Sequence, residues 1–254
     1  MKKTILISGA SSGFGYATAE KFVNHGDNLI ILARRLKRLE EFYNKYKDSA
    51  NIYYKQLDVR DFDQIKNLIE ELPENFKDID VLINNAGLAL GIEKADKASL
   101  EDWLTMIDTN IKGLIYLTKL ILPIMVKRNK GYIINIGSIA GTYPYPGGNV
   151  YCASKAFIKQ FSLALRADLL GRNIRVTNIE PGLSETEFSI VRYKGDTEKA
   201  SKLYKGTKPL KGEDIADIIY FLVNLQEHVN VNRIEIMPTC QSFSPLAVYK
   251  DEKS

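Results

Sequence analysis

The stretch Thr4-Ile5-Leu6-Ile7-Ser8-Gly9-Ala10-Ser11-Ser12-Gly13-Phe14-Gly15 lies near the start of the chain and decides its fold. Residues 4–8 form a short apolar run, three glycines follow, and residues 16–23 have the spacing of a helix. A strand that turns through glycines into a helix presents free amide groups, and side chains there would block an approaching phosphate. The stretch therefore predicts a nucleotide-binding turn, although its Gly-x-x-x-Gly-x-Gly spacing differs from the usual Gly-x-Gly-x-x-Gly.

The alternation of apolar runs and helical segments continues along the whole chain. Strands are expected at residues 4–8, 28–33, 51–57, 79–83, 132–136, 174–179 and 233–237, and helices at 37–47, 61–72, 100–127, 150–170 and 214–225. The strands do not alternate apolar with polar residues, so both faces of the sheet must be buried. The sequence predicts one α/β domain over residues 1–254, with a doubly wound parallel sheet and helices on both faces.

Residues 184–208 interrupt this rhythm, because they are polar and contain several glycines. We expect an insertion of helical turns there that serves as a substrate lid. Residues 239–248 are apolar enough that exposure to solvent is not expected, so we expect a subunit contact for the segment 239–254.

Composition excludes several classes of protein. The net charge is +4, but basic and acidic residues are interleaved, so neither nucleic acid nor a membrane is an expected partner. Cys152 and Cys240 lack metal-ligand spacing, and a His-based metal site or triad would have to use His25 or His228, both in polar surroundings. No metal is expected. The first apolar run is too short for a signal sequence, which favours a soluble cytoplasmic protein.

The end of the second strand indicates which nucleotide the turn binds. An enzyme that uses NAD usually has an acidic residue about 20 positions beyond the glycines. Here the sequence reads Leu32-Ala33-Arg34-Arg35, and two guanidinium groups can hold a 2′-phosphate with help from the Ser11 hydroxyl. NADP(H) is therefore the expected cofactor, the alternative being that both arginines only begin a solvated helix. Asp58 follows the third strand, where it either meets the adenine amino group or caps a turn.

The second chemical motif is Tyr151-Cys152-Ala153-Ser154-Lys155. Residues four apart share one face of a helix, so the Tyr151 phenol and the Lys155 ammonium are expected to point into the same space. A nearby ammonium favours the phenolate and would lower the pKa of the phenol from about 10 toward neutrality. Ser138 can then fix the oxygen at which the reaction occurs. The alternative is a buried tyrosine with an exposed lysine one turn later.

Taken together, these motifs resemble the short-chain dehydrogenases/reductases in order and spacing. The matching residues are Ser8-Gly9-Ala10-Ser11-Ser12-Gly13-Phe14-Gly15, Asn84-Asn85-Ala86-Gly87, Asn110, Ser138, Tyr151-x-x-x-Lys155 and Pro181-Gly182. One departure is Ser8, where the family usually has threonine, but either hydroxyl can tie the turn to a neighbouring strand. The resemblance implies a Rossmann-type sheet of about seven strands in the order 3-2-1-4-5-6-7. It also implies a homo-oligomer, either a dimer or a tetramer.

The resemblance gives each matching residue a role. Tyr151 would be the general acid/base, and Lys155 would lower its pKa and hold the nicotinamide ribose. Ser138 would bind the substrate oxygen and Asn110 would complete a proton relay. The implied cofactor-binding residues are Gly9, Ser11, Ser12, Gly13, Phe14, Gly15, Arg34, Arg35, Asp58, Val59, Asn85, Ala86, Gly87, Tyr151, Lys155, Pro181 and Gly182, and Asn84 would contact the adenosine. Because the Asn110 amide competes with the backbone, we expect a local helix distortion with a bound water.

Further segments point to a subgroup of the family. Gly147-Gly148-Asn149-Val150-Tyr151, Ile179-Glu180-Pro181-Gly182 and Met237-Pro238 resemble the NADP-dependent enzymes that interconvert small 3-hydroxy acids and their carbonyl forms. Such acids include serine, allo-threonine and 3-hydroxypropionate. Arg192 is then expected to pair with the substrate carboxylate, unless it is a solvated lid residue.

Glu180 either accepts a hydrogen bond from a substrate amino group or stabilises the end of its strand. The alternative functions are a 3-oxoacyl carrier-protein reductase, another carbonyl reductase acting on a steroid or polyol, and a non-catalytic NADP-binding protein.

Overall fold

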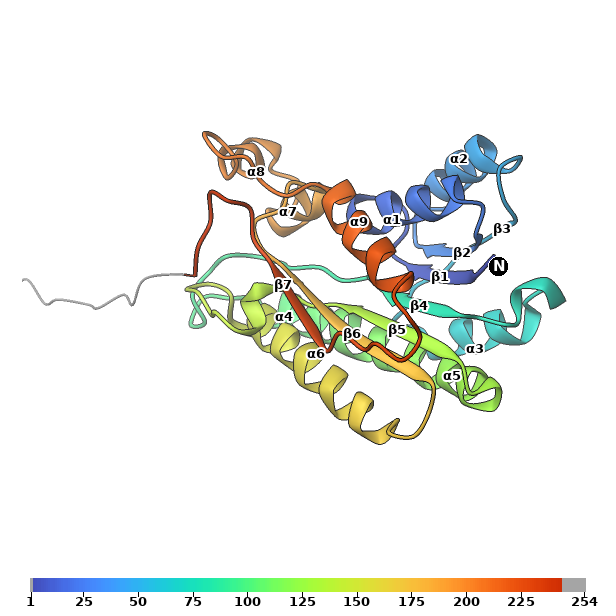
Figure 1. The fold of residues 1–254 in the computed structure, drawn as a ribbon. Helices are drawn as coiled ribbons and strands as arrows, with labels where there is room; N and C mark the ends of the chain where they lie inside the picture. Colours follow the sequence, from blue (N-terminus) through green and yellow to red (C-terminus); the bar gives the residue numbers. More distant parts are fainter. Residues whose placement is uncertain (1, 244–254) are drawn as a thin grey trace, which may run out of the picture.

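The fold is a single α/β domain built on one parallel sheet (Figure 1). A computed structural model describes residues 2–243 of the chain. The strands are β1 (Thr4–Ser8), β2 (Asn28–Ala33), β3 (Ile52–Gln56), β4 (Val81–Asn84), β5 (Gly131–Ile136), β6 (Ile174–Pro181) and β7 (Arg233–Ile236). They form a seven-stranded sheet in the order β3-β2-β1-β4-β5-β6-β7, and every pairing is parallel. The predicted Rossmann-type strand order is confirmed.

Helices cover both faces of this sheet, as Figure 1 shows. They are α1 (Gly13–Asn24), α2 (Leu36–Tyr46), α3 (Phe62–Glu71), α4 (Leu100–Ile107), α5 (Gly113–Arg128), α6 (Asn149–Asp168), α7 (Glu187–Arg192), α8 (Thr197–Lys202) and α9 (Gly212–Val223), with the short turns η1 (Glu74–Phe76), η2 (Asp108–Lys112) and η3 (Ile139–Gly141). Helices α1, α2 and α9 share an apolar cluster with one face of the sheet, and α3, α5 and α6 share a second cluster with the other. Burial of both faces is what the continuous apolar strands require.

The stretch Leu100–Arg128 is long and apolar enough to cross a membrane by length and composition alone. In the fold it is divided into α4, the π-helical turn η2 and α5. Leu117, Ile121 and Met125 of α5 are fully buried against the sheet. The apolar character of α5 is therefore explained by the core of the domain.

The strand order reverses between β1 and β4, and a serine hydroxyl joins these two strands at that point. The Oγ of Ser8 accepts hydrogen bonds from the amides of Asn85, at 3.1 Å, and Ala86, at 3.0 Å. The side-chain amide of Asn85 donates in return to the carbonyls of Ser8 and Gly9. The expectation that the Ser8 hydroxyl ties the turn to a neighbouring strand is confirmed.

The insertion at 184–208 contains the predicted helical turns, α7 and α8, which lie beyond the end of the sheet in Figure 1. Its two ends meet, because Ser184 and Leu210 form an isolated parallel bridge. The amide of Glu185 donates to the Leu210 carbonyl at 2.8 Å. The insertion therefore leaves the domain and returns to it at one point. Of the expected subunit contact at 239–254, residues 244–254 lie outside the described part of the chain.

We expect Ser8→Ala to lower the free energy of unfolding by about 1–3 kcal/mol, because the Ala86 amide loses its acceptor. Ser8→Thr keeps the hydroxyl and should change the free energy of unfolding by less than about 1 kcal/mol. Urea denaturation of the two variants measures the difference. Equal losses would show that volume, and not the hydroxyl, matters at this position.

Candidate active site

The turn after β1 is shaped for close approach of a ligand to the backbone. Gly9 and Gly13 have φ angles of +69° and +54°, in the left-handed region that favours glycine. A Cβ on Gly9 would lie only 3.0 Å from the Cα of Ala86, and one on Gly15 would collide with the Gly9 carbonyl oxygen. No side chain caps the first amides of α1 among the described residues. These amides and the helix dipole fit the pyrophosphate of a dinucleotide.

A cavity of about 510 Å³ extends from this turn along the carboxyl ends of the strands. The predicted site residues that line it are Gly9, Ser11, Ser12, Gly13, Phe14, Arg34, Arg35, Asp58, Val59, Asn85, Ala86, Gly87, Ser138, Tyr151, Lys155, Pro181, Gly182 and Arg192. Gly15, Asn110 and Glu180 are not among the lining residues. Asn84 lies beneath the floor, where its amide donates to Thr118 and Asn135. The fold therefore brings the predicted residues of several separate loops around one space.

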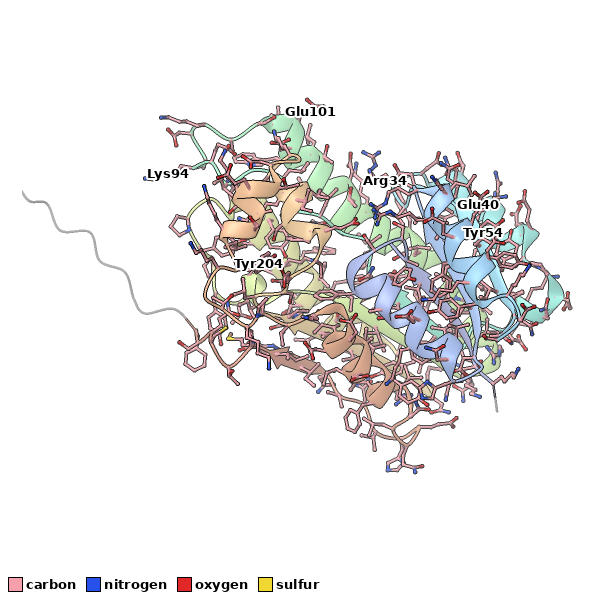
Figure 2. The ribbon with its side chains drawn as sticks, turned by 90° about the horizontal axis from the view of Figure 1, so that it is seen from above. Arg34, Glu40, Tyr54, Lys94, Glu101 and Tyr204 are labelled. Atoms are coloured by element: carbon pink, nitrogen blue, oxygen red, sulfur yellow. The ribbon has the colours of Figure 1, made fainter. Side chains whose placement is uncertain are left out.

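Arg34 and Arg35 follow β2 at one end of the cavity. In Figure 2, Arg34 lies between Glu40 and Tyr54 on one side and Lys94 and Glu101 on the other. The guanidinium of Arg35 donates to the Ser11 hydroxyl at 3.0 Å and to the Ser12 hydroxyl at 2.7 Å. This cluster of donors fits a phosphate group.

Asp58 follows β3 at the same end of the cavity. Its carboxylate accepts hydrogen bonds from the backbone amide and the guanidinium of Arg60. Burial alone would raise the pKa of Asp58, but the hydrogen bonds from Arg60 outweigh it and lower the pKa. The turn-capping geometry anticipated for Asp58 is therefore present, and its side chain also faces the cavity.

Asn110 lies within the π-helical turn η2, so the predicted distortion of this helix is confirmed. Its side chain donates to the carbonyl of Leu88 and accepts from the amide of Leu88, both at 2.8 Å. A Cβ on Gly87 would lie 3.2 Å from the Asn110 Oδ1 and 3.6 Å from the Lys155 Nζ. The widened turn thus places the Asn110 amide behind the loop after β4 and close to Lys155.

Tyr151 and Lys155 are both buried on the first turns of α6. The Lys155 ammonium donates to the Ile136 carbonyl at 2.8 Å and lies 5.8 Å from the centroid of the Tyr151 ring. Burial lowers the pKa of Lys155 to about 8. Burial also raises the pKa of Tyr151, and the hydrogen bond with Ser138 offsets this only in part. Within the protein alone, the lowered phenol pKa expected from the Tyr-x-x-x-Lys pair is not found, because desolvation outweighs the favourable contacts.

A family model described as short chain dehydrogenase matches residues 3–196. The chain belongs to the short-chain dehydrogenase family. It is thus an oxidoreductase that acts on CH–OH groups, as the motifs predicted.

Individual relatives of this dehydrogenase match over nearly its whole length. The NADP-dependent 3-hydroxy acid dehydrogenase of Salmonella typhi is 53% identical over 247 residues, which cover 97% of this chain and 99% of that protein. Sulfoacetaldehyde reductase 2 of Chromohalobacter salexigens is 47% identical over 252 residues, covering 99% and 100%. A solved closed form of serine dehydrogenase complexed with NADP⁺ has a TM-score of 0.95 and 51% identity, covering 98% and 100%. The cofactor predicted from Arg34 and Arg35 is the one named for two of these proteins.

Glu180 of this dehydrogenase is fully buried and pairs with Arg233, whose Nε lies 2.8 Å from its Oε2. Its other oxygen accepts from the Asn178 amide at 2.7 Å. Burial raises the pKa of Glu180, and Arg233 opposes this rise. Because these partners occupy the carboxylate and the cavity does not reach it, the structure supports the strand-stabilising alternative. The expected contact with a substrate amino group is not supported.

Arg192, at the end of α7, faces the cavity. Its guanidinium donates to the Tyr145 hydroxyl at 2.9 Å and lies 5.1 Å from the centroid of the same ring. Phe188 of α7 packs against Tyr151, with ring centroids 5.6 Å apart. Lys194, the other lid cation considered in the sequence, pairs instead with Asp102 at 2.7 Å. Arg192 is therefore the lid cation that the dehydrogenase presents near Tyr151.

Several residues of the site were not predicted from the sequence. Tyr145 lies in a loop and Phe188 in α7, and neither was assigned a role in the site from the sequence, because only their aromatic character set them apart. Glu187 and Arg38 meet across the mouth of the cavity from helices distant in the sequence. Arg38 follows Arg35 by three residues, and this spacing was the only signal in the sequence that the two arginines share one face.

Lys155 should reduce the stability of this dehydrogenase below pH 8. Its pKa is about 8 when folded and about 10.5 when exposed in the unfolded chain, so unfolding binds a proton between these values. Stability therefore rises with pH across this window. We expect the unfolding free energy of the wild type to rise by about 2 kcal/mol relative to Lys155→Met between pH 7 and pH 9.5. The hydrogen bond lost in the variant changes the difference in unfolding free energy by the same amount at every pH. A difference that does not vary with pH would contradict the lowered pKa of Lys155.

Proposed function

We propose that this dehydrogenase interconverts small 3-hydroxy acids and their carbonyl forms with NADP(H), and that Tyr151 is the general acid/base. The observation that carries the proposal is the arrangement of one cavity. It has arginines and serine hydroxyls at one end, and Tyr151, Ser138 and the lid cation Arg192 at the other. An anion-binding end and an acid/base end are what a phosphorylated dinucleotide and a small carboxylate substrate require together.

The cofactor end supports NADP(H) over NAD(H). Arg35 donates to the hydroxyls of Ser11 and Ser12, so its guanidinium is held against the glycine turn, where it would meet a 2′-phosphate. No acidic residue follows β2 at the position where NAD enzymes hold the ribose hydroxyls. When bound, NADP(H) gives or takes the hydride at the substrate carbon.

At the other end, Ser138 and Tyr151 hold the substrate oxygen between two hydroxyls. In reduction, the Tyr151 hydroxyl gives its proton to the oxygen as negative charge develops on it. In oxidation, the phenolate of Tyr151 takes the proton of the substrate alcohol. Lys155 holds the nicotinamide ribose, and Asn110 supports Lys155 in a proton path away from Tyr151.

Arg192 binds the acidic group of the substrate. In a 3-hydroxy acid the reacting carbon and the carboxylate are separated by one carbon. Sulfoacetaldehyde, the substrate named for the Chromohalobacter salexigens relative, has the same spacing between its carbonyl and its sulfonate. A guanidinium at a fixed distance from Tyr151 serves either anion through charge-assisted hydrogen bonds.

The quaternary structure is also a proposal. Leu100 and Leu104 of α4 are 67% and 51% exposed, and Leu163 of α6, a helix that packs on α4, is 40% exposed. Apolar side chains on neighbouring helices favour a homo-oligomer, a dimer or a tetramer, in which this face is covered. A monomeric mass in light scattering would contradict it.

We expect Tyr151→Phe to lose turnover by about a hundred- to ten-thousandfold while it still binds NADPH, because only the proton donor is removed. Since burial raises the pKa of Tyr151, wild-type oxidation should increase with pH and reduction should decrease. Steady-state rates with serine, allo-threonine, 3-hydroxypropionate, 3-hydroxyisobutyrate, sulfoacetaldehyde and a 3-oxoacyl thioester measure both effects. Preference for the thioester would favour the carrier-protein reductase. Full activity of Tyr151→Phe would refute the mechanism.

We expect Arg192→Ala to raise the Michaelis constant for 3-hydroxy acids by about 10- to 100-fold, because a charge-assisted hydrogen bond is lost. Its turnover of an uncharged aldehyde of similar size should stay near the wild-type value. Lys194→Gln is the matched control, since this lid cation pairs with Asp102. An unchanged Michaelis constant in Arg192→Ala would contradict the proposed role of Arg192 in binding the substrate carboxylate.

A further inference from the structure

A lid carboxylate occupies the arginines at the cofactor end of the cavity. Glu187, the first residue of α7, accepts a hydrogen bond from Arg35 at 2.7 Å through one carboxylate oxygen. Its other oxygen accepts from Arg38, which lies one turn further along α2. Burial alone would raise the pKa of Glu187, but the two arginines outweigh it and lower the pKa. The carboxylate is therefore ionised at neutral pH.

The same guanidinium groups also contact the glycine turn. Arg35 donates to the hydroxyls of Ser11 and Ser12, and Arg38 donates to the Ser11 carbonyl at 3.4 Å. Ser11, Ser12, Arg35 and Glu187 all line the cavity. An anion is thus already held where the proposed 2′-phosphate would meet Arg35. A phosphate dianion and a carboxylate on the same two arginines repel each other.

Helix α7 connects this point to the opposite end of the cavity. Glu187 is followed directly by Phe188, which packs on the Tyr151 ring, and the helix ends at Arg192 beside Tyr145. Glu187 and the residues near the proposed substrate position therefore belong to the same six-residue helix.

We propose that Glu187 is a specificity-determining residue that competes with the 2′-phosphate of NADP(H) for Arg35 and Arg38. The carboxylate separates from the two arginines when the phosphate binds and pairs with them again when the phosphate leaves. Arg38 is then a second phosphate-binding residue beside Arg35. The competition lowers the affinity for NADP(H) and favours its release. This inference rests on the proposed use of NADP(H).

The test measures equilibrium binding of NADPH, NADH and 2′,5′-ADP to the full chain by calorimetry. Glu187→Gln removes the competing charge with little change in size, so NADPH and 2′,5′-ADP should bind about tenfold more tightly. NADH lacks the 2′-phosphate, and its affinity should stay within about twofold. Arg38→Gln should weaken NADPH and 2′,5′-ADP, and leave NADH unchanged. The gain in Glu187→Gln should shrink at high salt, because the charges are partly exposed.

Glu185→Gln is the matched control, because Glu185 is a neighbouring lid carboxylate that does not line the cavity. Its affinities should equal those of the wild type. Unchanged or weaker binding of NADPH by Glu187→Gln would overturn the competition, and weaker binding would mean that Glu187 closes over the bound phosphate. An equal gain for NADH would also overturn it. A wild type that binds NADH as tightly as NADPH would instead refute the cofactor assignment itself.

Discussion

The joint between β1 and β4 is the constraint on which the rest of the site depends. At this point the strand order reverses, so the loops after the two strands separate and leave a crevice between them. The Ser8 hydroxyl and the Asn85 side-chain amide hold the two loops together through partly buried hydrogen bonds. Glycine at 9 and 15 lets the backbones come this close. Loosening this joint would move the cofactor turn relative to the loop that borders Lys155.

Burial of Tyr151 and Lys155 opposes the charged forms of both side chains. Lys155 and Tyr151 are both buried, and burial alone shifts each pKa toward the uncharged form. A positive charge or a hydroxyl near Tyr151 lowers its pKa more in a desolvated setting than in water. Groups that bind in the cavity therefore offset the rise in pKa that burial causes. The π-helical turn at Asn110 has a similar character, because it exchanges regular helical hydrogen bonds for a side chain that clamps the Leu88 backbone.

Helix α7 connects the two ends of the cavity. Its first residue, Glu187, pairs with the arginines of the cofactor end, and its last, Arg192, reaches the acid/base end. The insertion leaves and returns at one bridge between Ser184 and Leu210. The residues proposed to meet the cofactor phosphate and the substrate carboxylate therefore lie at the two ends of one short helix.

Local patterns of glycine, apolar residues and spaced polar groups were enough to predict the glycine turn, the alternation of strands and helices and a distorted helix at Asn110, and the family resemblance implied the strand order. Which charges meet could be read only from the folded chain. Glu180 was open to two interpretations until Arg233, 53 residues away in the chain, was found beside it. Glu187 lies 152 residues from Arg35, and no periodicity can signal such a pair. The pKa of Tyr151 likewise depends on how deeply the fold buries its ring, since desolvation is a property of the packed protein and not of the spacing between Tyr151 and Lys155.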